Sequence, residues 1–195
     1  MTAPTVTTNF SEIHKDAAEH WENITAGTRA WIRIGTALCG KAAGGDAVLA
    51  SVQESLENRG IDALVSEVGC LGLCFAEPLL DIQMPGGSRV FYSNVRSDDV
   101  DPILNSHLVS GAPVIEKALG YLGEVPVDGI PNLDDHPMRA MTERIALRNA
   151  GVIDPYDINQ YIANGGYQGL NKVLTEMTPQ EVLDEVTGSG LRGRG

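Results

Sequence analysis

The amino-acid sequence predicts an α/β fold: a mixed β-sheet with covering helices, followed by a short, mainly helical extension. The first observation is that residues 29–122 alternate short runs of β-branched and aromatic residues with helix-period segments. The second is a Pro-, Gly- and Asp-rich stretch at residues 123–137, which predicts a linker. The third is an amphipathic pattern in residues 1–28 and capping signals in residues 138–195, which predict flanking helices.

The first expected element is an amphipathic helix near the N-terminus. From Phe10 to Ile24 the apolar residues recur at helical spacing, and acidic and basic residues fill the positions between them. Such a stripe more often packs against the protein's own core than against a partner. We therefore interpret it as a packing face.

The sheet domain is expected to open with a strand at residues 30–34. A helix follows, because Asp46 is a favourable N-cap residue, the apolar residues behind it share one face, and Gly60 supplies a C-terminal stop. A second strand is expected at residues 63–68, which end at a glycine. The order of strand, helix and strand predicts a parallel crossover.

An antiparallel hairpin and a covering helix complete the predicted domain. Residues 79–84 and 89–95 have strand composition, and the sequence PGGS between them predicts the turn. Ser97 is a favourable N-cap for a last helix, which is expected to close at Gly111. A parallel crossover followed by a hairpin and a helix is the thioredoxin-like arrangement, and we predict it for residues 29–122.

The C-terminal extension carries several helix signals. Asp154 before a proline, and Thr178 with Glu181 at capping-box spacing, predict helix starts. Gly165 and Gly188 predict helix stops. Because these helices are short, we expect the extension to be poorly ordered or aggregation-prone in the isolated chain.

Composition and charge argue against several classes of function. The chain has 195 residues, 43% of them hydrophobic, and its 26 acidic and 14 basic residues give a formal net charge of -12. This charge disfavours nucleic-acid binding, because it repels phosphate backbones. The apolar runs are too short to cross a bilayer, and the N-terminus lacks the basic and apolar regions of a signal peptide. We expect no direct membrane insertion and a cytoplasmic location.

Three cysteines give the sharpest chemical signal. Cys70 and Cys74 lie four residues apart directly after the second strand, and Cys39 follows the first strand. Gly69 and Gly72 flank and interrupt the pair, and they let the backbone fold closely around whatever the sulfurs hold. The pattern favours an iron-sulfur site with Cys39, Cys70 and Cys74 as thiolate ligands. The simplest alternative for Cys39 alone is a small buried hydrophobic residue.

Other uses of the cysteines are less favoured. A zinc site usually shows a Cys-x-x-Cys knuckle twice, or histidines at fixed offsets, and none of the four histidines has such an offset. A disulfide between Cys70 and Cys74 conflicts with the odd cysteine count and the missing secretory signal, which indicate a reducing compartment. A thioredoxin-type oxidoreductase needs a Cys-x-x-Cys at the first helix of the domain, and the sequence has none there.

The C-terminal run GLRGRG places two arginines among glycines. Glycine lets backbone amides approach an anion closely, and guanidinium groups compensate the anion's charge. The run therefore favours an anion-binding loop, and a flexible tail is the simpler interpretation.

Three separated motifs carry a resemblance to a known family. Their sequences are CGKAAG at residues 39–44, VGCLGLCFAEPL at residues 68–79 and VFYSNV at residues 90–95. In this order they resemble the thioredoxin-like ferredoxin domain at the N-terminus of NADH-binding flavoprotein subunits of the complex I family. Soluble relatives in that family include electron-bifurcating hydrogenases and NAD-dependent formate dehydrogenases. The resemblance spans nearly the whole middle section and implies a 2Fe-2S cluster.

The extension resembles another part of the same subunits. The sequences IALRNAGVIDP at residues 145–155, YIANGGY at residues 161–167 and SGLRGRG at the C-terminus are similar to the opening of their FMN- and NADH-binding domain. The resemblance implies that Gly193, Arg194 and Gly195 begin the loop that cradles FMN. The chain stops inside that motif, so we expect the N-terminal portion of a longer subunit. FMN and NAD would then bind only with the remaining part, and this chain alone would not oxidise NADH.

One cysteine of the family's pattern is missing. The four-thiolate site of these subunits has its first cysteine a few residues ahead of the second, where this chain has Arg33, Ile34 and Gly35. Three alternatives remain open: a 2Fe-2S cluster completed by a non-cysteine group, a domain that has lost its cluster, and a cluster held jointly with a partner. Each thiolate removed alters the charge of the cluster and hence its potential.

Two functions from different classes follow. The first is the electron-transfer portion of an NADH-dependent flavin and iron-sulfur oxidoreductase subunit, which relays electrons between FMN and iron-sulfur centres beside other subunits of a redox complex. The second is a cluster-free, thioredoxin-like docking module for partner subunits. Iron content separates them, because iron bound to thiolates absorbs visible light and a cluster-free protein is colourless.

Overall fold

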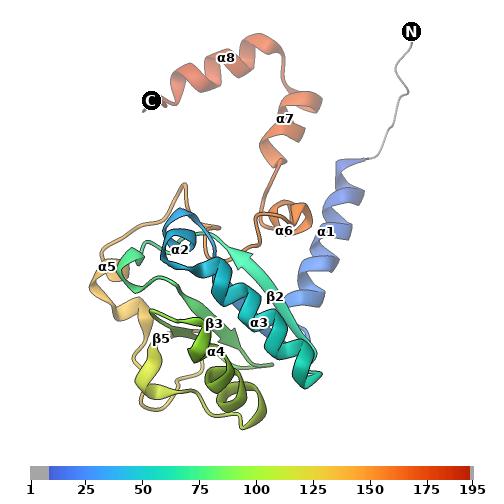
Figure 1. The fold of residues 1–195 in the computed structure, drawn as a ribbon. Coiled ribbons are helices and arrows are strands. Elements are labelled where there is room, and N and C mark those ends of the chain that lie inside the picture. The colour runs from blue at the N-terminus through green and yellow to red at the C-terminus, as the bar shows by residue number, and fades with distance from the viewer. Residues whose placement is uncertain (1–8, 194–195) are drawn as a thin grey trace.

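The computed structural model describes residues 9–193, and its centre is a five-stranded mixed sheet (Figure 1). The strands lie in the order β2-β1-β3-β4-β5, and their bounds are β1 Ala30–Gly35, β2 Ala63–Val68, β3 Leu80–Gln83, β4 Arg89–Tyr92 and β5 Ala118–Leu122. β1 and β2 are parallel, whereas β3 is antiparallel to β1, β4 to β3 and β5 to β4. The predicted crossover and hairpin are present, and the thioredoxin-like α/β fold is confirmed.

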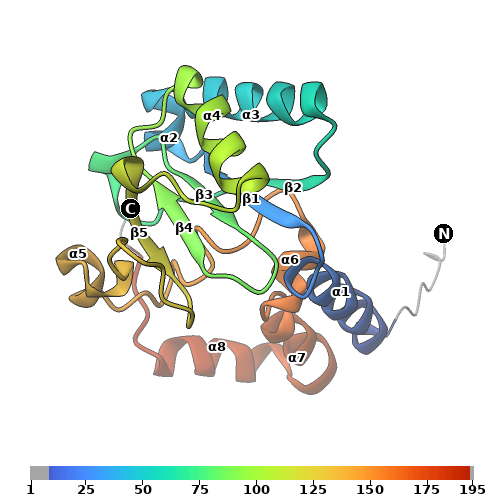
Figure 2. The ribbon, with the colours of Figure 1, turned by 90° about the horizontal axis from the view of Figure 1, so that it is seen from below.

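Two helices cover one face of the sheet (Figure 2). α3, Gly45–Arg59, and α4, Ser97–Leu104, pack against each other there, and the short α2, Leu38–Ala43, precedes α3. Successive strand residues point to opposite faces, so the even-numbered residues of β1, β3 and β4 lie beneath these helices. The buried side chains of this main core include Ile32, Ile34, Leu80, Ile82, Val90 and Tyr92.

The helix starts differ in detail from those predicted. The N-cap of α3 is Gly44, whose φ of 105° lies in the left-handed region, and Asp46 is instead an acidic residue in the first turn. Gly44 is also the C-cap of α2, so this one residue joins the two helices. Glycine adopts the left-handed φ of this junction without a steric penalty. In α4, Arg96 is the N-cap in place of Ser97, and its backbone N–H donates to Asp99 Oδ2 at 3.0 Å.

The odd-numbered strand residues form a buried polar cluster on the opposite face. Asp81 accepts hydrogen bonds from Arg33 Nη1 at 2.8 Å and from Arg89 Nη2 at 2.7 Å. The guanidinium carbon of Arg33 lies 3.4 Å from the centre of the Trp31 ring. Burial lowers the pKa of Arg33 to about 10, although the charge of Asp81 acts in the opposite direction. Arg89 also donates to the Gly151 carbonyl at 2.8 Å, so the cluster ties the extension to the sheet.

The N-terminal helix packs against part of the extension. α1, Phe10–Thr25, and α6, Ile158–Ala163, lie side by side in Figures 1 and 2. His20 Nε2 lies 2.7 Å from Asp157 Oδ2 across this contact. Asp157 is also the N-cap of α6, whereas the predicted N-cap, Asp154, accepts a backbone hydrogen bond from β2 at 3.3 Å. The extension is therefore held to the sheet domain at its start.

Residues 123–137 pack along the outer strand of the sheet. The Tyr121 N–H of β5 donates to the Pro131 carbonyl at 2.9 Å. Leu133 is buried over Gly120, and a Cβ added to Gly120 would lie 3.1 Å from the Leu133 side chain. The short helix α5, Pro137–Ala140, follows. A glycine inside β5 thus lets this segment approach the strand closely.

The last two helices contribute no buried side chain. α7, Gln168–Glu176, and α8, Pro179–Gly188, stand away from the sheet domain in Figure 1. The predicted capping box at the start of α8 is confirmed, because Thr178 and Glu181 accept each other's backbone N–H groups. None of the described helices, these two included, is long and apolar enough to cross a bilayer.

Candidate functional site

The cysteines lie where the two parallel strands end. Gly35 of β1 pairs with Val68 of β2, so both strands leave the sheet at the same edge. The Thr36 N–H donates to the Val68 carbonyl at 3.2 Å, which continues the pairing for one more residue. Cys39 follows the end of β1 and Cys70 follows the end of β2. Loops that leave one edge of a parallel pair are a common place for functional side chains.

Cys70 and Cys74 form a close pair. Their sulfur atoms are 3.8 Å apart, and the Gly72 N–H donates to Cys70 Sγ at 3.2 Å. Gly72 has a φ of 86°, which turns the chain back on itself between the two cysteines. Leu71 and Leu73 are buried on either side of this glycine and hold the loop against the domain. The loop therefore turns at the exposed Gly72, and the buried leucine on each side of this glycine fixes the loop on the domain.

The distance between the two sulfurs fits a tetrahedral metal ion. Two thiolates at the corners of a tetrahedron with bonds of about 2.3 Å are separated by about 3.8 Å. Burial raises the pKa of the Cys70 thiol, and the nearby Cys74 and Glu77 act in the same direction, whereas the Gly72 N–H acts against them. A bound metal ion would displace the thiol protons, because thiolate is the ligand form.

Cys39 stands apart from this pair. It is half-buried near the start of α2. α2 packs so closely on the end of β1 that the Gly35 carbonyl leaves no room for a Cβ on Gly40. Within residues 9–193, no three His, Cys, Asp or Glu side chains lie close enough to hold a single metal ion. The structure thus brings Cys70 and Cys74 together and does not bring Cys39 into one group of three with them.

This arrangement fits a two-iron cluster in part. A 2Fe-2S cluster takes two protein ligands on each iron, so a group of three around one ion is not required. Cys70 and Cys74 have the separation that one iron needs. The second iron would need a second pair of ligands, of which Cys39 is the thiol that the chain still offers.

Glu77 is a site residue that the sequence reasoning missed. Its side chain is buried, and Oε2 accepts the Leu79 N–H at 2.9 Å. Burial raises the pKa of the Glu77 carboxyl, and the hydrogen bond from Leu79 acts against this shift. The signal in the sequence was a single charged residue inside the apolar run FAEPLL. A buried carboxyl is uncommon and needs a partner or a function.

The extension covers one side of the cysteine loop. Arg144 Nη2 donates to the Cys70 carbonyl and to the Ala150 carbonyl, each at 3.2 Å. A Cβ on Gly69 would lie 3.2 Å from the Ala150 Cβ, so the two segments are in contact. On the other side, the exposed ring of Phe75 stacks on His136, with ring centres 5.8 Å apart. The site is thus partly shielded and partly open to solvent.

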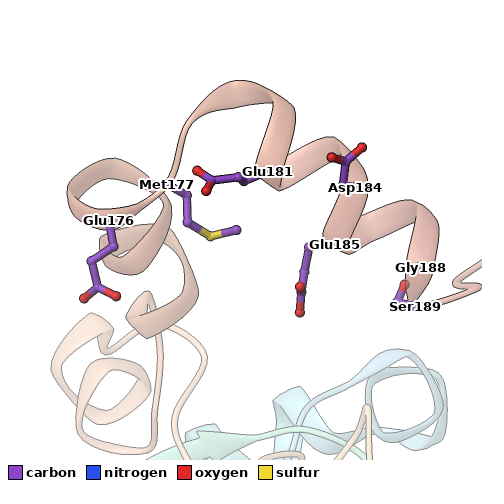
Figure 3. Close-up of a pocket in the computed structure, with 7 residues that line it drawn as sticks. All are labelled: Glu176, Met177, Glu181, Asp184, Glu185, Gly188 and Ser189. Carbon is purple, nitrogen blue, oxygen red and sulfur yellow. The ribbon is translucent and has the colours of Figure 1, made fainter.

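The predicted flavin-loop residues lie far along the chain from this site. Gly193 follows α8 as exposed coil with open space around it, whereas Arg194 and Gly195 lie outside the described residues. A hollow of about 650 Å³ lies along α7 and α8 (Figure 3). It is lined by four carboxylates, and Figure 3 shows Asp184 and Glu185 pointing in different directions. The carboxylates do not converge on one point, so they do not form a binding site.

Comparison with known proteins relates the chain to redox subunits, although no family model matches it. Over 52 residues it is 67% identical to the NADP-reducing hydrogenase protein HndC of Solidesulfovibrio fructosivorans, which covers 27% of this chain and 10% of that protein. Over 55 residues it is 47% identical to an NADH-quinone oxidoreductase subunit of Rhizobium meliloti, which covers 28% of this chain and 13% of that protein. The chain therefore spans about a tenth of the length of these two relatives.

A third relative is a 2Fe-2S ferredoxin. The chain is 32% identical to that of Clostridium pasteurianum over 69 residues, which covers 34% of this chain and 65% of the ferredoxin. Among solved structures, a thioredoxin-like [2Fe-2S] ferredoxin from Aquifex aeolicus aligns with a TM-score of 0.41 and 20% identity, over 48% of this chain and 99% of that one. The sequence matches confirm the predicted resemblance to NADH-binding oxidoreductase subunits that carry a thioredoxin-like ferredoxin domain.

Proposed function

We propose that this chain is the electron-transfer portion of an NADH-dependent flavin and iron-sulfur oxidoreductase subunit. The observation that carries the proposal is the pair of sulfurs, Cys70 Sγ and Cys74 Sγ, 3.8 Å apart at the edge where β1 and β2 end. A 2Fe-2S cluster bound there would supply one-electron transfer, and the subunit's FMN would exchange hydride with the nicotinamide. Cys39, Cys70 and Cys74 are the thiolate ligands in this proposal.

The residues around the pair have defined roles in it. Leu71 and Leu73 are buried beside the sulfurs and would limit the access of water. The Gly72 N–H donates to Cys70 Sγ, and hydrogen bonds to ligand sulfur raise the reduction potential of a cluster. Arg144 holds the Cys70 carbonyl and brings a positive charge to the same loop. These contacts would orient the ligands before the cluster is inserted.

The remaining FMN-binding residues and the partner subunits would lie outside this chain. We propose that Gly193, Arg194 and Gly195 begin an FMN loop that further residues of a longer subunit complete. HndC, the Rhizobium meliloti oxidoreductase protein and a second hydrogenase protein, HndB, are all named as subunits, and this supports a complex with partner subunits. The odd number of cysteines supports a reducing compartment, which we propose to be the cytoplasm.

The second candidate function is a cluster-free docking module. It is favoured by one observation, namely that the chain has three cysteines, whereas a four-thiolate cluster site needs four. In this alternative the thioredoxin-like domain keeps its fold and binds partner subunits, and electrons bypass it.

Iron and acid-labile sulfide content separate the two functions. The chain is purified without oxygen, and an EPR spectrum is recorded after reduction. We expect two irons and two sulfides per chain, and a loss of both in Cys70→Ser and Cys74→Ser. Phe75→Leu is the matched control, because Phe75 adjoins Cys74 and carries no ligand atom. If the wild-type chain holds no iron after anaerobic reconstitution, the docking module is the correct function.

A further inference from the structure

Glu77 has an unsatisfied oxygen in the middle of the cysteine site. The residue is 6% exposed, and among residues 9–193 its Oε1 is the buried carboxylate oxygen that lacks a hydrogen-bond partner. Buried polar atoms are nearly always paired, because leaving one unpaired costs free energy. The unpaired oxygen therefore points to a ligand.

The carboxyl lies against the loop that carries Cys39. A Cβ added to Gly35 would be 2.8 Å from Glu77 Oε2 and 3.2 Å from Oε1. A Cβ added to Gly40, the neighbour of Cys39, would be 3.3 Å from Oε2. On the other side, Glu77 follows Cys74 by three residues, and its charge acts on the Cys70 thiol. The carboxyl thus sits between the segment that bears Cys39 and the loop that bears the sulfur pair.

The Glu77 carboxyl lies where the fourth protein ligand of a two-iron cluster is missing. Two irons need four protein ligands, and the chain has three cysteines. The missing thiolate of the family pattern falls at residues 33–35, and the space beside Gly35 is filled by the Glu77 carboxyl. A carboxylate carries the same single negative charge as a thiolate and is an established metal ligand.

We propose that Glu77 Oε1 is the fourth ligand of the cluster, on the iron that Cys39 binds, while Cys70 and Cys74 hold the other iron. This inference rests on the proposed function, because it requires that the domain holds a two-iron cluster. It gives one iron two sulfur ligands from the protein and the other iron one sulfur and one oxygen ligand. The two irons are therefore chemically different.

The first test needs no variant. The full chain is loaded with ⁵⁷Fe and sulfide under anaerobic conditions, and the oxidised protein is measured by Mössbauer spectroscopy. We expect two ferric sites of equal area with different isomer shifts, because oxygen is a harder ligand than sulfur. Two identical ferric sites would overturn the assignment of Glu77 and would leave the proposed function standing. A chain that binds no iron would overturn both.

The second test replaces the carboxyl. Glu77→Ala and Glu77→Gln are expected to reduce iron and sulfide to below about half of the wild-type content, with a changed visible and EPR spectrum. Glu67→Gln is the matched control, because Glu67 lies in β2 near the same edge and its backbone N–H, which the substitution leaves in place, donates to Asp154. Far-ultraviolet circular dichroism of each variant shows whether the fold is intact.

A rescue variant tests the position itself. Glu77→Ala empties the space beside Gly35, so the double variant Gly35→Cys/Glu77→Ala can place a thiol where the carboxyl was. We expect the double variant to recover the iron content and to absorb more strongly in the visible range than the wild type, because a fourth thiolate is present. If the single variants Glu77→Ala and Glu77→Gln keep the wild-type iron content and spectrum, Glu77 is not a ligand.

Discussion

At the scale of single residues, a buried histidine makes the stability of the fold depend on pH. His107 lies in the π-helical turn Asn105–Val109 that follows α4, and it is 3% exposed. Its Nδ1 lies 2.8 Å from the Tyr92 hydroxyl, which also accepts the Val114 N–H at 3.3 Å. Burial lowers the pKa of His107 to about 4 and raises the pKa of Tyr92 to about 12. Both side chains are therefore neutral at physiological pH.

This histidine predicts a loss of stability in mild acid. The folded pKa of about 4 lies below the usual value of 6.5, so the unfolded state binds more protons between these two pH values. Stability is thus lost as the pH falls through that range, by at most about 3 kcal/mol. Urea unfolding of the wild type and of His107→Gln at several pH values between 7 and 4.5 measures this. The variant should show a shallower pH dependence, and equal slopes would contradict the assignment.

The residues at the site differ in how far the sequence predicts them. The sulfur pair follows from local spacing, because a glycine between Cys70 and Cys74 is enough to turn the loop. Glu77 depends on burial against Gly35 and Gly40, which are about 40 residues away in the chain, and no local pattern encodes that contact. The buried bonds from Arg33 and Arg89 to Asp81 are equally non-local, since they join three different strands.

At the scale of elements, the sequence predicted the longer helices and strands and missed two short elements that contain a glycine, β5 and α2. The first helix, the first two strands and the capping box of α8 were predicted from periodicity and caps, and the structure confirms them. β5 was missed because Gly120 interrupts its strand pattern. The structure shows that the Leu133 side chain packs over Gly120, where an added Cβ would be crowded. α2 was missed because it has only six residues and packs on the end of β1 through Gly40, which has no room for a Cβ.

One contact between elements joins the extension to the cysteine loop. Gly151 has a φ of 77°, and a Cβ on it would collide with the Leu71 side chain. We expect Gly151→Ala to destabilise the fold by about 1–3 kcal/mol and to displace Leu71. Because Leu71 adjoins Cys70, the iron content after anaerobic reconstitution should fall as well. Urea unfolding and iron analysis measure the two effects.

Gly169→Ala provides the control for this prediction. Gly169 lies within α7, has no heavy atom within 4 Å of an added Cβ, and does not need a positive φ. Its replacement should raise local helix stability and leave both the unfolding midpoint and the iron content unchanged. Equal effects of the two substitutions would show that the contact between Gly151 and Leu71 does not link the extension to the loop.

At the scale of the whole molecule, the extension consists of two parts with different packing. Its first part contributes the buried side chains of Ile153 and Ile162 and the hydrogen bond from Arg89 to the Gly151 carbonyl. Its second part, α7 and α8, leaves large apolar side chains exposed, including those of Leu174 and Leu183. Because α7 and α8 bury no side chain, we restrict the expectation of poor order in isolation to these two helices.

Two truncations test this division of the extension. A chain that ends at Gly166 keeps every buried contact of the extension, so its free energy of unfolding should match that of the full chain within about 0.5 kcal/mol. A chain that ends at Asn149 loses Ile153 and Ile162, whose burial contributes about 1.5–3 kcal/mol each, so it should unfold at a clearly lower urea concentration. Hydrogen exchange should agree, with protected amides in α6 and rapid exchange throughout α7 and α8. If the chain ending at Gly166 were as unstable as the shorter one, α7 and α8 would have to pack on the sheet domain.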